Sequence, residues 1–142
     1  MLFSQAKSRD VVALTTAETL ATLTGLTIAP APARVAALRV KTRGPGTLVT
    51  WSNVHSFGPD AVTVRTPDKI QGDQDTSAVS DKHHDPIGKR VLTETGQDLG
   101  TLDDIDFDEG TGHIERLITA DQDIPGYRLL GAGTYAIVIA VP

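Results

Sequence analysis

The chain has 142 residues, of which 39% are hydrophobic and only 4% aromatic, and its formal net charge is −5. This length fits one ordinary domain or two very small ones, and the core must be built mainly from Leu, Ile and Val. The absence of cysteine excludes disulfides, thiolate metal sites and cysteine nucleophiles.

Charge is distributed unevenly along the chain. Residues 1–75 contain 8 basic and 6 acidic side chains, a net +2, whereas residues 76–142 contain 5 and 12, a net −7. An acidic second half argues against direct binding of nucleic acid, which depends on Lys and Arg to neutralise phosphates. No apolar run reaches the ~18 residues of a membrane span, and the first ten residues lack the pattern of a signal peptide, so we expect a soluble, unprocessed cytoplasmic protein.

Two segments of the chain match other segments further along it. Residues 12–40 match residues 91–119 without a gap at a shift of 79, and residues 58–64 match residues 133–139 at a shift of 75. Two blocks in the same order predict a small unit that occurs twice. The identical pairs of the first block are Val12 and Val91, Thr16 and Thr95, Leu20 and Leu99, Thr22 and Thr101, Leu23 and Leu102, and Leu38 and Leu117.

The matched segments have the pattern of β-strands. Apolar and polar residues alternate in residues 26–28 and 105–107, which directs one face of each strand inward. Just before the first of these, Leu20 and Leu23 are three residues apart, and the same spacing recurs in the second copy. A helix could explain this spacing, but a β-bulge fits better beside Gly25, because glycine is a poor helix residue.

Turn signals follow these strands. Residues 29–32 and 108–112 are rich in Pro or Gly and occupy the same place in the two copies. Each predicts a hairpin turn before the next strand, 33–42 or 113–120. Between the copies, residues 67–86 are polar and contain Gly and Ser, which is typical of a linker. No helix longer than a turn or two is expected.

The second copy carries a distinctive order of motifs. It opens with Ile87-Gly-Lys-Arg-Val-Leu, continues with Gly96-Gln-Asp-Leu-Gly and an apolar strand that ends at Asp108, and then has Thr111-Gly before the next strand. This order resembles the PRC-barrel domain, the small β-barrel named after the cytoplasmic part of the photosynthetic reaction-centre H subunit.

The first copy resembles the same family more loosely. Ala17 and Ala21 stand where the second copy has glycines, although residues 51–64 resemble the closing strands of the family better than the second copy does. The resemblance implies an all-β fold of two tandem small antiparallel PRC-barrel-like β-barrels joined by a polar linker. The expected boundaries are 1–66 for the first unit, 67–86 for the linker and 87–142 for the second unit.

The resemblance also implies a class of function. PRC-barrels look like adaptor folds and share no catalytic residues, so we expect a non-enzymatic protein–protein interaction or scaffold protein without a cofactor. The sequence does not identify the partner, but the unlike charges of the halves favour head-to-tail or reciprocal self-association into an oligomer. Two alternatives stay open: an RNA-processing or ribosome-associated adaptor that resembles the ribosome-maturation factor, and a small-molecule or metal binder at the cleft between the barrels.

Four carboxylates of the second copy have the spacing of a calcium loop, at its positions 1, 3, 5 and 12. Position 6 is Glu109 where the loop requires glycine. If Ile105 and Phe107 point inward, the three aspartates point outward in a row, so we expect a solvated acidic strand edge and no metal. The four residues are Asp104, Asp106, Asp108 and Glu115.

The histidines give no assignable site. His83 and His84 are adjacent in the predicted linker and hold no fixed geometry for zinc. His55 has serines nearby in sequence but no orienting acid that the sequence can nominate, and His113 follows a turn in the other copy. We therefore assign no catalytic, cofactor-binding or metal-binding residue.

Basic side chains gather on the first copy. Arg39, Lys41 and Arg43 alternate along a predicted strand and share one face, with Arg34 nearby. They form either a solvated outer face or a contact surface for an acidic partner. The acidic row of the second copy is one such partner, in the same chain or in a neighbour.

Overall fold

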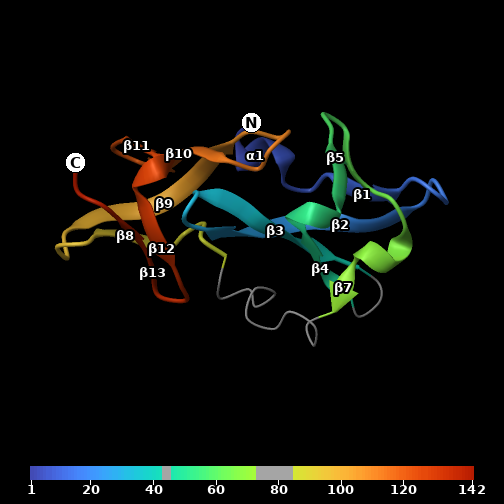
Figure 1. The fold of residues 1–142 in the computed structure, drawn as a ribbon, viewed down its shortest axis with the longest axis horizontal. Coiled ribbons are helices and arrows are strands. Elements are labelled where there is room, and N and C mark those ends of the chain that lie inside the picture. The colour runs from blue at the N-terminus through green and yellow to red at the C-terminus, as the bar shows by residue number, and fades with distance from the viewer. Residues whose placement is uncertain (43–45, 73–84) are drawn as a thin grey trace.

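The computed structural model describes residues 1–42, 46–72 and 85–142, which form two β-sheets (Figure 1). The first sheet has the strand order β5-β6-β1-β2-β3-β4-β7, and the second has the order β11-β10-β9-β8-β13-β12. The strands of the first sheet are β1 (Asp10–Ala13), β2 (Thr19–Ala29), β3 (Arg34–Lys41), β4 (Gly46–Thr50), β5 (Val54–Phe57), β6 (Ala61–Val64) and β7 (Gln71–Gly72). Those of the second sheet are β8 (Arg90–Thr93), β9 (Asp98–Phe107), β10 (Ile114–Thr119), β11 (Asp123–Pro125), β12 (Leu129–Ala132) and β13 (Ala136–Ile139).

The helical elements of the described residues are short, as predicted. They are α1 (Phe3–Ala6), η1 (Trp51–Asn53), η2 (Pro67–Lys69) and η4 (Gly126–Arg128). In the part of the chain that the structure describes, none of them is long and apolar enough to cross a membrane.

The predicted all-β class is confirmed, but the prediction of two antiparallel barrels needs correction. β1 runs parallel to β6, and β8 runs parallel to β13, so both sheets are mixed. Within the described residues each sheet is also open, since its two end strands do not pair with each other. Alternation along a strand identifies the face that turns inward, but it carries no information about the direction of the neighbouring strand.

The two sheets repeat one strand order. The order β5-β6-β1-β2-β3-β4 corresponds to β12-β13-β8-β9-β10-β11, and the strand pairs match residue by residue. Asp10 of β1 pairs with Ala61, and Arg90 of β8 pairs with Ala136 in the same way. The first sheet adds β7 as an extra strand beside β4. The structure therefore contains the same unit twice, as the sequence blocks predicted.

The start of the repeat is shifted by one residue from the ungapped alignment. Val11, rather than Val12, is the counterpart of Val91, because both are fully buried at the second position of equivalent strands. The turn that follows β1 is one residue longer than the turn that follows β8. The bonds that close these turns run from the amide of Ala13 to the carbonyl of Glu18 and from the amide of Thr93 to the carbonyl of Gln97.

The predicted β-bulges are present in both long strands. On β2, Leu20 is the extra residue, because Val11 pairs with Ala21 while Val12 pairs with Thr19. On β9, the irregularity falls within residues 98–101, which include the glycine of the predicted turn. A bulge bends a strand and increases its twist, so it helps each long strand to follow the curvature of its sheet.

The first sheet extends into the predicted linker. Gln71 and Gly72 of β7 pair with Leu48 and Gly46 of β4, beyond the boundary expected at residue 66. The middle of the linker, residues 73–84, lies outside the described residues, and so do His83 and His84.

The two halves share one core. The buried apolar side chains of both sheets form a single cluster, which includes Phe57 and Phe107 and has Trp51 packed against it. Phe107 of β9 makes edge contacts with Trp51, at 6.2 Å between centroids, and with Phe57, at 5.4 Å. The cleft that we predicted between two barrels is thus filled by side chains of the described residues, which removes the basis for a binding site there.

A symmetric backbone contact joins the halves where β3 and β10 begin. The amide of Val35 donates to the carbonyl of Gly112 at 2.8 Å, and the amide of Ile114 donates to the carbonyl of Ala33 at 3.0 Å. Each bond becomes the other when the two units are exchanged, because Val35 and Ile114 are equivalent at the repeat shift of 79, and so are Ala33 and Gly112. The halves are therefore related locally as the two subunits of a two-fold dimer would be.

Candidate interaction surfaces

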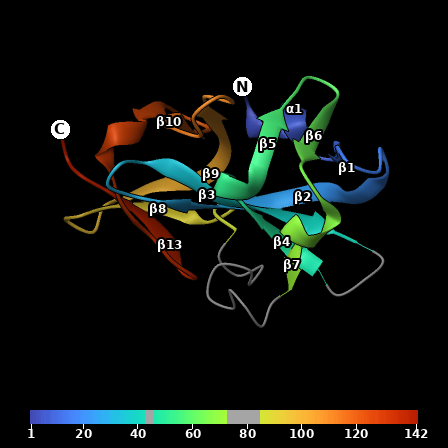
Figure 2. The ribbon, with the colours of Figure 1, turned by 45° about the vertical axis from the view of Figure 1, so that its right-hand side comes forward.

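The acidic row of β9 is engaged with the N-terminal segment. Asp104 accepts hydrogen bonds from the amide of Ser4, at 3.0 Å, and from its hydroxyl, at 2.5 Å. The amino group of Met1 lies 3.0 Å from a carboxylate oxygen of Asp106, and α1 lies against the end of β9 (Figure 2). Ile105 and Phe107 are fully buried, which confirms the predicted alternation.

Asp106 also binds the neighbouring strand. Its second carboxylate oxygen accepts two hydrogen bonds from Arg116 of β10, at 2.8 and 3.0 Å. Burial by itself would raise the pKa of Asp106, but the hydrogen bonds from Arg116 and from the amino terminus outweigh it and lower the pKa below its ordinary value. The carboxylate therefore contributes to holding the N-terminal segment on the second sheet.

The side chains of the four residues with calcium-loop spacing do not converge on one point where an ion could bind. Asp108 accepts the amides of Gly110 and Thr111, at 2.8 and 3.0 Å, and these bonds lower the pKa of its carboxyl group. Glu115 is exposed on β10, the strand that follows the turn capped by Asp108. Across residues 1–42, 46–72 and 85–142, no three carboxylate or imidazole side chains gather as metal ligands would.

The basic strand of the first half contacts a residue of the chain itself. Arg39 lies 3.3 Å from the carboxylate of Asp85, and both side chains are largely buried. Asp85 rests against Gly25, where an added Cβ would lie 2.2 Å from the carboxylate, so this close approach requires glycine. Burial raises the pKa of Asp85, even though the amide of Ile87 and the charge of Arg39 act in the opposite direction.

The basic strand and the acidic row therefore do not pair with each other within the described chain. Arg39 pairs with Asp85, while the acidic row binds the N-terminal segment and Arg116. Arg34 donates to the carbonyls of Pro30 and Pro32 in its own hairpin turn. Lys41 is exposed, and Arg43 lies outside the described residues.

The remaining candidates stay apart at the surface. His55 is exposed on β5, and His113 is exposed after the β9–β10 turn. The hydroxyl of Ser52 lies 3.3 Å from the hydroxyl of Thr50. These positions give no arrangement of a nucleophile with a base.

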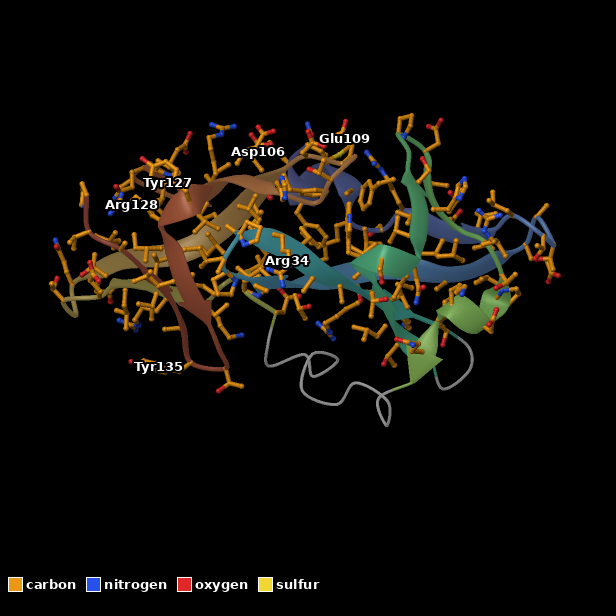
Figure 3. All side chains as sticks on the ribbon, in the orientation of Figure 1. Arg34, Asp106, Glu109, Tyr127, Arg128 and Tyr135 are labelled. Atoms are coloured by element: carbon orange, nitrogen blue, oxygen red, sulfur yellow. The ribbon has the colours of Figure 1, made fainter. Side chains whose placement is uncertain are left out.

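A surface that the sequence did not suggest lies on the C-terminal hairpin. Tyr127 is 85% exposed, Tyr135 75%, Leu130 48% and Val141 42%. Tyr127 and Tyr135 lie at the two ends of the β12–β13 hairpin (Figure 3). We call these four residues the hairpin strip. Most large apolar side chains are buried in this protein, so four exposed ones within residues 127–141 mark a candidate contact surface.

A family comparison covers the half of the chain that carries this strip. Residues 80–140 match the PRC-barrel domain family. The second half is a PRC-barrel domain. The match includes all strands from β8 to β13 and confirms the resemblance of the second copy, whereas the first half lies outside it. A search of curated proteins finds no match to the chain.

The hairpin strip is specific to the PRC-barrel domain of the second half. The repeat places a counterpart of each strip residue in the first half, at a shift of 75, and every counterpart is polar. The backbone of these hairpins therefore forms without apolar side chains at these positions, so the fold does not require the strip. The counterparts of Tyr127, Leu130, Tyr135 and Val141 are Ser52, His55, Asp60 and Thr66.

Three strip residues, Leu130, Tyr135 and Val141, also lie in an uncharged segment of the chain, whereas Tyr127 is followed by Arg128. No side chain from residue 129 to residue 142 is charged, although 22% of the whole chain is Asp, Glu, Lys or Arg. The equivalent segment of the first half, residues 54–67, contains Asp60 and Arg65. Edge strands are usually protected from association by charged residues, and β12 is the end strand of its sheet.

Proposed function

We propose that the chain is a non-enzymatic protein-interaction module, built from two PRC-barrel-type units that are fixed against each other, and that the hairpin strip is its protein-binding surface. The observation that carries the proposal is the exposure of four large apolar side chains at positions where the repeated unit has polar ones. Exposed apolar groups of this kind are typical of protein contact sites.

The tandem arrangement is part of the proposal. The first half has the same strand order as the PRC-barrel domain of the second half, with equivalent parallel pairs and equivalent bulges. We therefore infer that residues 1–72 are a second, diverged unit of the same type. Its contribution is structural, because it completes the shared core, and the C-terminal hairpin projects from the side of the second sheet (Figure 1).

The chemical groups of the described residues support a non-enzymatic role. The carboxylates of Asp104, Asp106 and Asp108 accept hydrogen bonds from backbone amides, a hydroxyl, the amino terminus or Arg116. The exposed strip offers apolar surface and two phenols. A cytoplasmic location fits the absence of cysteine, which is usual in a reducing compartment.

The experiment that tests the proposal is affinity capture from the source cell with the wild-type chain and an exchange variant. The exchange variant carries the first-half residues at the strip: Tyr127→Ser, Leu130→His, Tyr135→Asp and Val141→Thr. Since these residues already occur in the same fold, the variant should fold. We expect proteins bound by the wild type, additional copies of the chain included, to be lost from the variant.

The control is His55→Leu, which places an apolar residue on the equivalent hairpin of the first half. It should retain the proteins that the wild type binds. Identical binding by the wild type and the exchange variant would show that the strip has no role. Strip-independent binding of ribosomal subunits would favour the ribosome-associated alternative instead.

A further inference from the structure

We infer that the hairpin strip binds a second copy of this chain, across a two-fold axis that passes beside Gly131. The inference rests on the proposed function, because it names the partner of the same surface. Three properties of the strip lead to it: its lack of charge, its spacing about Gly131 and its place at an end strand.

Charge limits where two copies of the chain can meet. Each copy has a net charge of −5, so two copies repel each other over most of their surface. Leu130, Tyr135 and Val141 lie in segment 129–142, which has no charged side chain. The ionic groups beside the other end of the strip are of opposite sign: Arg128 follows Tyr127, and the carboxylate of Glu94 accepts the amide of Val141 at 3.1 Å. At the Tyr135 end, two further ionic groups form a neutral pair. That pair joins Arg90 and Asp98 at 2.5 Å. The strip is therefore a face on which two like-charged copies can meet with little repulsion.

The spacing of the strip makes it complementary to itself. A two-fold contact uses the same patch on both copies, so a residue on one side of the axis meets a residue from the other side. Tyr127 precedes β12 and Tyr135 follows the β12–β13 turn, so the two rings lie at opposite ends of the hairpin that carries Gly131 (Figure 3). When two hairpins meet in antiparallel fashion at Gly131, Tyr127 of one copy lies beside Tyr135 of the other. Tyrosine suits such a contact because it buries a large rigid ring at low entropic cost.

The centre of the strip permits close approach. An added Cβ at Gly131 would meet no atom within 4 Å, so the backbone there is accessible to a neighbour. Leu130 occupies a bulge between the pairs Leu129–Ile139 and Gly131–Val138. The bulge interrupts the regular ladder of β12, so we expect side-chain packing rather than a continuous intermolecular sheet to hold the contact.

The other edges of the sheets lack these properties. β11, at the opposite end of the second sheet, carries Asp123, whose carboxylate lies 2.5 Å from Arg116. β5, the counterpart of β12, exposes His55, and its hairpin contains Asp60 and Arg65. Charges of this kind discourage pairing of edge strands. Head-to-tail association through the acidic row is also disfavoured, since Asp104 and Asp106 already bind groups of their own chain.

Sedimentation equilibrium over a range of concentrations tests the inference. The wild type should form a dimer that dissociates on dilution. Leu130→Glu should weaken the dimer at least about tenfold, because it removes buried apolar surface and places two like charges near the axis. The matched control is His55→Glu, which adds the same charge at the equivalent place in the first half and should leave the dimer unchanged.

The dependence of dimerisation on salt concentration distinguishes this contact from one made by ion pairs. Because the strip is uncharged and the copies repel each other, added salt should leave the dimer unchanged or strengthen it. A wild type that is monomeric at every concentration overturns the inference, and so does a dimer that salt dissociates or that Leu130→Glu does not weaken. The proposed function is judged separately: a monomer that still captures another protein through the strip would retain the function and refute the second copy as its partner.

Discussion

The two halves of this chain have the same strand order but differ at equivalent positions, both inside and outside. At the junction, Trp51, Phe57 and Phe107 form an aromatic cluster on one side. The repeat shifts place Gly126, Ala132 and Ile28 at the same positions on the other side. On the surface, the first hairpin is polar and the second is apolar. Backbone topology is thus preserved, while packing and surface have diverged.

The difference inside the molecule shows how one core serves two units. The symmetric hydrogen bonds between residues 33–35 and 112–114 fix the halves in a two-fold relation. The aromatic cluster then fills one side of the junction. On the other side, Gly126 lies against Ile114, the residue whose amide bonds to Ala33 of the first half. An added Cβ at Gly126 would lie 2.0 Å from the carbonyl oxygen of Ile114. A small domain buries too little surface alone, so this shared junction stabilises both.

The largest expected effect comes from breaking the aromatic side of the junction. Phe107→Ala should lower the free energy of unfolding by about 3–5 kcal/mol, because it leaves a cavity among Trp51, Phe57 and the core. Denaturant unfolding followed by tryptophan fluorescence and by circular dichroism should show one transition in the wild type. Two separate transitions would contradict a shared core.

The glycine side of the junction should be the next most sensitive. Gly126→Ala should cost about 1–3 kcal/mol, since the added methyl group has no room beside Ile114. Gly133→Ala is the control, because an added Cβ there meets no atom within 4 Å. Thermal unfolding of both variants measures the difference, and equal melting temperatures would argue against the tight packing at Gly126.

The pH dependence of stability should differ in direction between Asp106 and Asp85, the two carboxylates at the junction. The pKa of Asp106 is lowered in the folded state, so its contribution to stability is present above its ordinary pKa of 3.8 and is lost as the pH falls through the lower folded value. The pKa of Asp85 is raised, so its contribution is present below 3.8 and is lost as the pH rises through the higher folded value.

Urea unfolding at a series of acidic pH values measures how each carboxylate changes the free energy of unfolding with pH. Asp106→Asn should reduce the loss of stability in acid, whereas Asp85→Asn should reduce the loss that accompanies rising pH. The two variants should therefore change the slope of stability against pH in opposite directions. A change of the same sign in both would contradict the different environments of the two carboxyl groups.

The smallest expected effect on stability belongs to the hairpin strip. The exchange variant with first-half residues at the strip should change the free energy of unfolding of the monomer by no more than about 0.5 kcal/mol per substitution, because these side chains are exposed. Unfolding measured at a concentration where the wild type is monomeric checks this. A much larger loss would mean that the strip stabilises its own hairpin.

Much of the fold could be predicted from the sequence because the repeat and the alternation are local patterns. The inward face of β9, the bulge at Leu20 and the hairpin turns followed from residues close together in the chain. The one-residue error at Val12 arose because the turn lengths differ, and an ungapped match between two short segments cannot reveal that difference.

The contact surfaces could not be predicted because they depend on topology. The parallel pairing of β13 with β8 places β12 at the end of the sheet, and Leu130 of that strand is exposed. In the sequence, residues 129–139 look like ordinary core strands. The partners of the acidic row and of Arg39 come from Met1, Ser4 and Asp85, which are distant in the chain and carry no recognisable pattern.

The most direct test of the central claim is a cysteine placed at the proposed two-fold axis. The chain contains no cysteine, so Gly131→Cys introduces a single thiol, and Ser56→Cys introduces one at the equivalent position of the first half. Under mild oxidation, Gly131→Cys should form a disulfide-linked dimer on a non-reducing gel, because the two thiols face each other across the axis. Ser56→Cys should remain a monomer. Equal cross-linking of both variants, or of neither, would contradict the account.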